Sequence, residues 1–481
     1  MQTRRQFLTL AGAAVAVGVP ALLGSPALQA ASERAHRRPA RGERKLVSAA
    51  VEERLARVQA SIADPELAWL FENCYPNTLD TTVVLGELDS KPDTFIVTGD
   101  IPAMWLRDSS AQVWPYVPLA GTDEALKTLF RGLIHRHARC ISIDPYANAF
   151  QQDPHGTQPL SWAAADMTDM KPGVAERKWE IDSLCYPIRL AYGYWRATAD
   201  TQPFDEDWRA AMRLVVQTFR EQQRLAGPGP YRFQRSSETP LDTLAGEGYG
   251  SPTRKVGLIH SMFRPSDDAC IHPFLVPANL FAVESLRQLA ALLRKIHGDA
   301  ALAGECERLA DEVTAALMRH GRARTSGGDL IWAYETDGFG NHLFMDDANV
   351  PSLTSLPYLG CCSRRDPLYR RTRARIWSND NPYFFKGAAA EGIGGPHVGA
   401  RMIWPMSIMM RALTSDDDAE IRACLVALKK SHAGTGFMHE AFDQDDPSHF
   451  TRSWFAWANS LFGELILDLN ERKPALLKES S

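Results

Sequence analysis

The sequence lacks the short motifs of several common enzyme classes. It has no HExxH pair for a zinc peptidase, no Walker loop for nucleotide phosphates, and no GxGxxG beside a predicted strand. Its eight cysteines show no CxxC or other metal-ligand spacing. These absences argue against zinc, nucleotide and dinucleotide chemistry. We interpret the cysteines as packing thiols and predict no disulfide.

The sequence also lacks a strongly basic region outside its N-terminus. The formal net charge is −5, and no run of Lys and Arg resembles a stripe that tracks phosphates. We therefore expect no nucleic-acid partner. Hydrophobic residues make up 45% of the chain, which is ordinary for a globular protein with a large core.

The first thirty residues predict an export signal. Arg4 and Arg5 precede an apolar run rich in Gly and Ala that Pro20 interrupts, which favours twin-arginine export over an uncleaved membrane anchor. We predict a signal at 1–30, a disordered basic spacer at 31–45 and one domain at 46–481. The expected location is periplasmic or otherwise extracytoplasmic, without stable membrane insertion once the signal is removed.

Helical periodicity dominates the rest of the chain. Apolar residues recur at helical spacing over 51–71 with a break at Asp64-Pro65, and over five further ranges: 124–139, 182–198, 207–225, 279–297 and 304–320. Gly298 is placed to end one of these helices. Short strands are expected at 94–98 and 330–334. With polar and aromatic loops spread along the whole chain, the pattern predicts an all-α (α/α)6 barrel with small β-hairpins; a helical solenoid lacks a repeat period to support it.

Two loci carry carboxyls suited to glycosidic bond cleavage, which needs an acid and a second carboxylate. Asp267 and Asp268 follow Arg264, whose charge could separate their pKa values. The alternative is that one of them caps a following helix. Glu440 follows a glycine-containing loop, and the acidic residues after it lack EF-hand spacing.

Other segments combine Arg, Asp and amides with aromatic rings, a combination that binds sugar hydroxyls and pyranose faces. For Trp454 and Trp457 the alternative is core packing, because their spacing is helical. The candidate wall residues are Trp105, Arg107, Asp108, Gln112, Asn349, Arg452 and Trp454.

These segments together resemble glycoside hydrolase family 125, the exo-α-1,6-mannosidases. The resemblance covers about residues 70–465 through nine motifs in order: NCYPNTLDTTV, TGDIPAMWLRDSSAQ, DPYANAF, ERKWEIDSLCYP, FRPSDDAC, YETDGFGN, FMDDANVPSL, GTGFMHEAF and FTRSWFAWANSLF. It implies an (α/α)6 barrel, an α-mannoside or mannose-containing glycan substrate, inversion of anomeric configuration, and no metal or cofactor.

Carried over by position, the resemblance implies that Asp267 is the general acid and Glu440 the general base, with Asp268 as the second choice for the acid. Arg107 and Asp108 would bind the terminal mannose. Further wall residues are implied at Gln112, Asp182, Arg264, Asn349 and Arg452, and His397 is the weakest of the candidates.

Two other functions are compatible with the residues. A calcium-assisted α-mannosidase could use the pairs Asp346-Asp347 and Asp445-Asp446 as ligands. A non-catalytic mannan-binding protein could use the same aromatic walls. Oligomeric state and the natural glycan are not predicted.

Overall fold

The computed structural model describes residues 36–479. The predicted export signal therefore lies outside the described residues. Five helices form a chain of contacts in which α5 packs against α7 and α14, α7 also packs against α9, and α14 also packs against α12. They are α5 (Leu106–Val113), α7 (Ile181–Thr198), α9 (Val276–Leu292), α12 (Pro405–Leu413) and α14 (Ala456–Arg472). Every residue of α5 and of α12 except Arg411 is buried, as expected for helices inside a ring.

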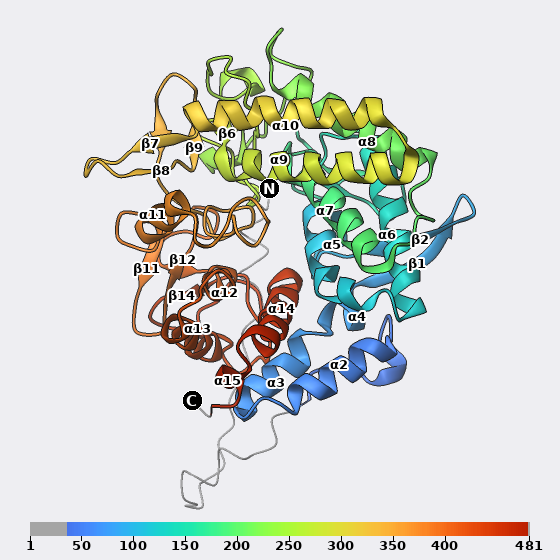
Figure 1. Cartoon of the computed structure of the whole chain (residues 1–481), viewed down its shortest axis with the longest axis vertical. Helices are drawn as coiled ribbons and strands as arrows, with labels where there is room; N and C mark the ends of the chain where they lie inside the picture. Colours follow the sequence, from blue (N-terminus) through green and yellow to red (C-terminus); the bar gives the residue numbers. More distant parts are fainter. Residues whose placement is uncertain (1–35, 480–481) are drawn as a thin grey trace, which may run out of the picture.

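A second set of helices covers these five. They are α2 (Ala49–Gln59), α3 (Pro65–Cys74), α6 (Glu124–Ile143), α8 (Glu206–Gln222), α10 (Ala300–His320), α11 (Pro367–Ile376) and α13 (Asp418–Ser431), with the short α4 (Asn77–Thr81) and α15 (Pro474–Leu477) beside them. From α3 onward the longer outer and inner helices alternate along the chain, except that a largely buried stretch of turns at 352–361 stands between α10 and α11. This is the predicted (α/α)6 barrel (Figure 1).

Local sequence signals account for the helix ends. Asp64, Asp123 and Asp299 cap α3, α6 and α10 by accepting backbone N–H groups. After α9 a π-helical turn, Leu293–His297, ends at Gly298, whose φ of 63° is left-handed, as predicted for that glycine. No helix begins directly after Asp268, since α9 starts at Val276, so the helix-cap alternative for Asp267 and Asp268 is wrong.

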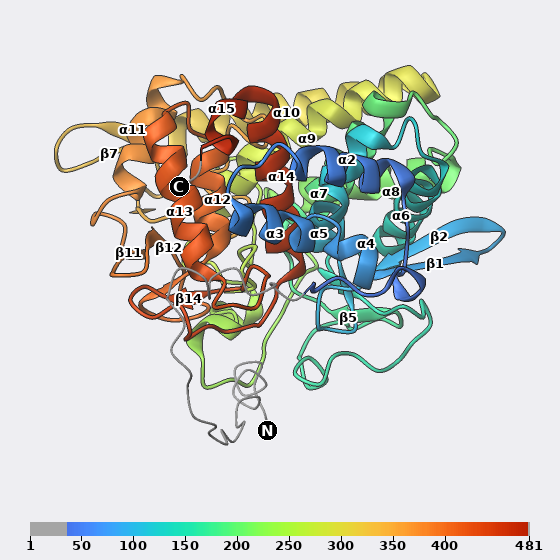
Figure 2. The same ribbon diagram turned by 90° about the horizontal axis from the view of Figure 1, so that it is seen from below.

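The strands are short and antiparallel. They are β1 (Val83–Leu88), β2 (Lys91–Ile96), β3 (Met104–Trp105), β4 (Ala149–Phe150), β5 (Val174–Glu176), β6 (Phe274–Leu275), β7 (Arg322–Arg324), β8 (Leu330–Trp332), β9 (Glu335–Thr336), β10 (His342–Leu343), β11 (Phe384–Lys386), β12 (Glu391–Ile393), β13 (Met402–Ile403) and β14 (Phe442–Asp443). The predicted strands near 94–98 and 330–334 appear in the hairpins β1–β2 and β7–β8. Figure 2 shows long loops, including those with β5 and β14, on one side of the helices.

The described part of the predicted spacer packs against the domain. Arg38 is buried, and its guanidinium pairs with Asp80 at 2.7 Å and also with Glu52. Residues 41–43 form a short 3-10 helix. Residues 36–45 thus differ from the disordered spacer predicted from composition, because the buried carboxylate of Asp80 and the partly exposed carboxylate of Glu52 give this arginine specific partners.

The cysteines agree with their interpretation as packing thiols. All eight are free, six of them buried and Cys361 and Cys362 partly buried. Among residues 36–479, none of the helices combines the length and apolar character needed to span a bilayer.

Candidate active site

Loops from distant parts of the chain meet around one small cavity, with an empty volume of about 350 Å³. Eight of the predicted site residues line it. The lining residues are Thr98, Ile101, Trp105, Arg107, Asp108, Pro265, Ser266, Asp267, Asn349, His397, Trp404, Glu440, Arg452 and Phe455. The two predicted catalytic carboxyls, Asp267 and Glu440, therefore share a cavity although they lie far apart in the sequence.

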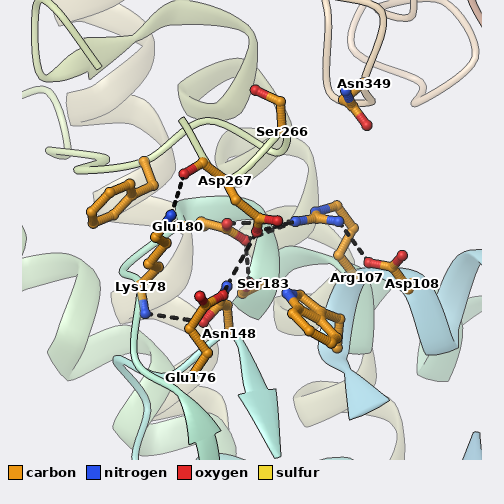
Figure 3. Close-up of polar contacts among 12 residues, drawn as sticks. Arg107, Asp108, Asn148, Glu176, Lys178, Glu180, Ser183, Ser266, Asp267 and Asn349 are labelled. Carbon is orange, nitrogen blue, oxygen red and sulfur yellow. Dashed lines mark hydrogen bonds and ion pairs between the residues drawn. The ribbon is translucent and has the colours of Figure 1, made fainter. Parts of the chain in front are cut away.

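Arg107 is the electrostatic centre of the cavity wall. Its buried guanidinium lies 2.6 Å from Asp108, 3.2 Å from Glu180 and 3.4 Å from Asp267 (Figure 3). It also lies 3.1 Å from Asp182. Arg107 is the second residue of α5, where the helix N-terminus adds further positive potential. One cation faces four carboxyl groups, so the cluster can be neutralised only if some of these carboxyls hold protons.

The pKa values follow from this crowding. Burial, together with the charges of Asp267 and Asp182, raises the pKa of Glu180 well above its ordinary value, although Arg107 opposes the shift. Burial also raises the pKa of Asp182 to about 6. The two carboxyls beside Asp267 thus hold their protons to higher pH than ordinary carboxyls do.

Asp267 is held in an unusual backbone conformation. Its φ is 67°, a left-handed value that costs a non-glycine residue on the order of 1 kcal/mol or more. Lys178 Nζ donates to its carbonyl oxygen at 2.7 Å, and Asn148 Nδ2 donates to its carboxyl at 3.3 Å. Its own N–H donates to the carbonyl of Arg264 at 2.8 Å. These bonds compensate the strain and direct the carboxyl into the cavity (Figure 3).

Glu440 lines the same cavity from a loop between α13 and α14. The residue is buried, and Arg452 Nε lies 3.3 Å from its carboxylate. Arg452 also pairs with Asp100. The preceding residue, His439, stacks on Phe450 with ring centroids 3.9 Å apart. These contacts therefore hold the loop in place around the Glu440 carboxylate.

Asp268 has a different environment from Asp267. Its carboxylate lies 3.4 Å from His397 Nδ1 and accepts from Ser266 Oγ at 3.4 Å, and it does not line the cavity. The geometry therefore favours Asp267 over Asp268 as the acid. His397, the weakest of the sequence candidates, does line the cavity.

Four other predicted wall residues lie outside the cavity lining. Gln112 is buried further along α5 and donates to the carbonyl of Val97 at 3.2 Å. Asp182 contacts Arg107, and Arg264 forms a buried ion pair with Glu335. Trp454 is half-buried. The sequence placed these four residues near the site, but their side chains do not line the cavity.

Trp457 packs in the core, as its helical spacing allowed. It is buried in α14, and the Arg107 guanidinium lies 5.6 Å from the centre of its ring. It therefore supports the cavity wall from behind.

Sequence reasoning missed several residues of the site. Trp404 and Phe455 form an aromatic wall, with ring centroids 5.9 Å apart and an interplanar angle of 79°. Lys178 and Glu180 belong to a motif that was recognised, but neither was assigned a role. The signal that could have identified them is the segment ERKWE, in which a Lys and two Glu lie within three residues of one Trp. Charged residues so close to a buried aromatic residue are seldom only solvent-exposed surface residues.

The acidic pairs considered for calcium are engaged within the protein. Asp346 accepts from Leu353 N at 2.7 Å and from Thr354 N at 2.9 Å. Asp445 pairs with Arg401 at 3.0 Å. In the described part of the chain, no group of three or more His, Cys, Asp or Glu side chains is arranged to hold a metal ion.

Residues 64–467 match the family model described as metal-independent alpha-mannosidase (GH125). A protein of Schizosaccharomyces pombe, named meiotically up-regulated gene 157 protein, is 45% identical over 461 residues, which cover 92% of this chain and 90% of the relative.

Two solved structures resemble the fold. One is a metal-independent α-mannosidase of Streptococcus pneumoniae in a non-productive substrate complex with α-1,6-mannobiose; it is 40% identical, with a TM-score of 0.84 over 89% of this chain and 100% of that chain. A bacterial glucoamylase complexed with acarbose has a TM-score of 0.53 at 12% identity, over 85% of this chain and 57% of that chain. The latter likeness concerns the fold alone.

Proposed function

This chain belongs to glycoside hydrolase family 125, the metal-independent α-mannosidases, and we propose that it is an exo-acting, inverting α-1,6-mannosidase. The observation that carries the proposal is that Asp267 and Glu440 line one small cavity beside Arg107 and Asp108. The α-1,6-mannobiose bound by the Streptococcus pneumoniae relative supports the linkage.

In the proposed reaction, Asp267 donates a proton to the glycosidic oxygen as the bond from that oxygen to the anomeric carbon breaks. Glu440 takes a proton from a water molecule, whose oxygen bonds to the anomeric carbon from the opposite face. The products are β-mannose and the leaving alcohol, and the two carboxyls end with their protonation states exchanged. The mechanism requires carboxyl groups about 6.5–9.5 Å apart to leave room for this water.

The walls of the small cavity supply the groups that bind the sugar. Arg107, Asp108 and Asn349 carry charged and amide groups that can bind the hydroxyls of a terminal mannose, and Trp404 and Phe455 offer apolar faces. The small volume of the cavity supports release of one sugar at a time from a chain end. The engaged carboxylates of Asp346 and Asp445 argue against the calcium-assisted alternative.

The test is proton NMR of α-1,6-mannobiose hydrolysis in the presence of a chelator, observed before mutarotation. We expect β-mannose to appear first. Initial α-mannose would contradict the assignment of Glu440 as a base, and hydrolysis that begins only after calcium is added would contradict the metal-independent mechanism for this chain.

Variants test the two carboxyls directly. Asp267→Asn and Glu440→Gln should each lower kcat by about 10²–10⁴. Asp446→Asn is the matched control, because Asp446 is an exposed carboxylate in the same loop as Glu440. Wild-type rates in Asp267→Asn or Glu440→Gln would remove that residue from the mechanism.

We also propose that the protein is exported by the twin-arginine route. Arg4 and Arg5 before the apolar run support this location. In a bacterial host with that pathway, α-mannosidase activity should occur in the periplasmic fraction and move to the cytoplasm when both arginines are changed to Lys. Unchanged fractionation would contradict the route.

A further inference from the structure

A second and larger cavity adjoins the candidate active site. Its empty volume is about 1290 Å³, compared with about 350 Å³ for the first. Ile101 and Arg452 line both cavities, so the two are neighbours across these side chains. The proposed hydrolysis of a terminal mannose gives the larger cavity no role.

The two cavities rest on one small apolar cluster, separate from the main core. Trp105 of the active-site cavity belongs to this cluster with Ile101 and Ala175, and Leu160 and Trp162 of the larger cavity pack against it. Because residues of both cavities pack in this one cluster, the walls of the two cavities keep a fixed position relative to each other.

The orientation of Trp162 is tied to the predicted acid. Its indole N–H donates to Glu176 Oε1 at 3.0 Å. The other carboxylate oxygen of Glu176 accepts from Asn148 Nδ2 at 3.2 Å, and the same amide group donates to Asp267 at 3.3 Å. Figure 3 shows Glu176, Asn148 and Asp267 in this arrangement. A chain of hydrogen bonds thus links Trp162 of the larger cavity to Asp267, which protonates the leaving group in the proposed reaction.

The lining of the larger cavity suits a neutral sugar. Trp162 is an aromatic ring that can stack on a pyranose, and Gln152, Gln158 and Ser161 carry amide and hydroxyl groups for its hydroxyls. The charged lining residues are Asp100, Asp153 and Arg452, so the cavity has no cationic excess that would select a phosphate or another anion.

We propose that this cavity binds the leaving-group part of the substrate, namely hexosyl residues beyond the one joined at the cleaved bond. The inference rests on the proposed function and extends it: the enzyme would prefer mannosides of three or more residues over the disaccharide. If the small terminal pocket holds one sugar, the rest of the glycan extends out of it, and the larger cavity offers the adjoining surface.

The test compares kcat/KM for linear α-1,6-linked mannobiose and mannotetraose. In the wild type we expect the tetraose to be the better substrate by about tenfold, which corresponds to one stacked sugar. Trp162→Ala should abolish most of this preference, and Trp195→Ala, which changes a half-buried tryptophan outside both cavities, should keep it.

A second variant guards against misfolding of the first. Gln152 and Gln158 are exposed, and changing both to Ala should lower the tetraose preference by a few fold. Equal kcat/KM for the two substrates in the wild type, or a preference that survives in both variants, would overturn the cavity assignment and leave the proposed function intact. Failure of the wild type to hydrolyse either substrate would overturn the proposed function, and the assignment with it.

Discussion

Replacement of Arg264 by Met should destabilise the protein strongly, although Arg264 does not line the cavity. The side chains of Arg264 and Glu335 are 1% and 0% exposed, and Arg264 Nε lies 2.6 Å from the carboxylate. Loss of the guanidinium leaves a buried carboxylate without its cation, which costs about 3–5 kcal/mol in free energy of unfolding. With about 2.1 cal/mol/K of unfolding entropy per residue over residues 36–479, this lowers Tm by about 3–5 °C.

The assay is thermal and urea unfolding followed by circular dichroism, with a surface pair as control. Arg364 pairs with Asp416 at 3.1 Å, but these side chains are 34% and 58% exposed, so Arg364→Met should cost less than about 1 kcal/mol. Adding Glu335→Gln to Arg264→Met should restore part of the loss, because the uncompensated charge is removed while an oxygen remains to accept from the N–H groups of residues 271 and 272. Equal stability of Arg264→Met and Arg364→Met would refute the reasoning.

Three further predictions concern protons and metal. Because burial raises the pKa of Glu180, we expect Glu180→Gln to keep most activity and Glu180→Leu to lose about 10–100-fold in kcat/KM; equal losses would show that a charged carboxylate is required. Burial lowers the pKa of His137 to about 3, so below about pH 6.5 the folded state binds fewer protons than the unfolded state. The contribution of His137 to stability is therefore fully present above about pH 6.5 and is lost as the pH falls toward 3. Between pH 7 and pH 5 the free energy of unfolding of the wild type should fall by about 2 kcal/mol more than that of His137→Asn, as measured by urea unfolding at each pH. The same pH dependence in both proteins would contradict this origin. Overnight dialysis against a chelator should leave kcat unchanged, and a loss restored by added calcium would reopen the metal-assisted mechanism.

The helices could be predicted from the sequence because their determinants are local. Apolar spacing marked α10, Asp64-Pro65 marked the break before α3, and Gly298 marked the end of a helix. The recognised motifs likewise indicated the two proposed catalytic carboxyls and most of the residues that line the cavity. Each of these signals lies within a few residues of what it determines.

Composition misled where a specific partner mattered. Residues 36–45 have the composition of a spacer, yet Arg38 pairs with Asp80, which lies 42 residues further along the chain. In the same way Gln112 and Arg264 lie close to cavity residues in sequence, but their side chains bind the carbonyl of Val97 and the carboxylate of Glu335.

Only the tertiary structure shows how the surroundings of Asp267 and Asp268 differ. Their sequence environments are almost the same, whereas the left-handed φ of Asp267 and its bonds from Lys178 and Asn148 turn that carboxyl into the cavity. The sequence by itself determined the helical class, the family and the types of residue in the site. Closure of the helical ring determined which of those residues meet, because contacts between residues hundreds of positions apart leave no periodic or local signal from which they could be predicted.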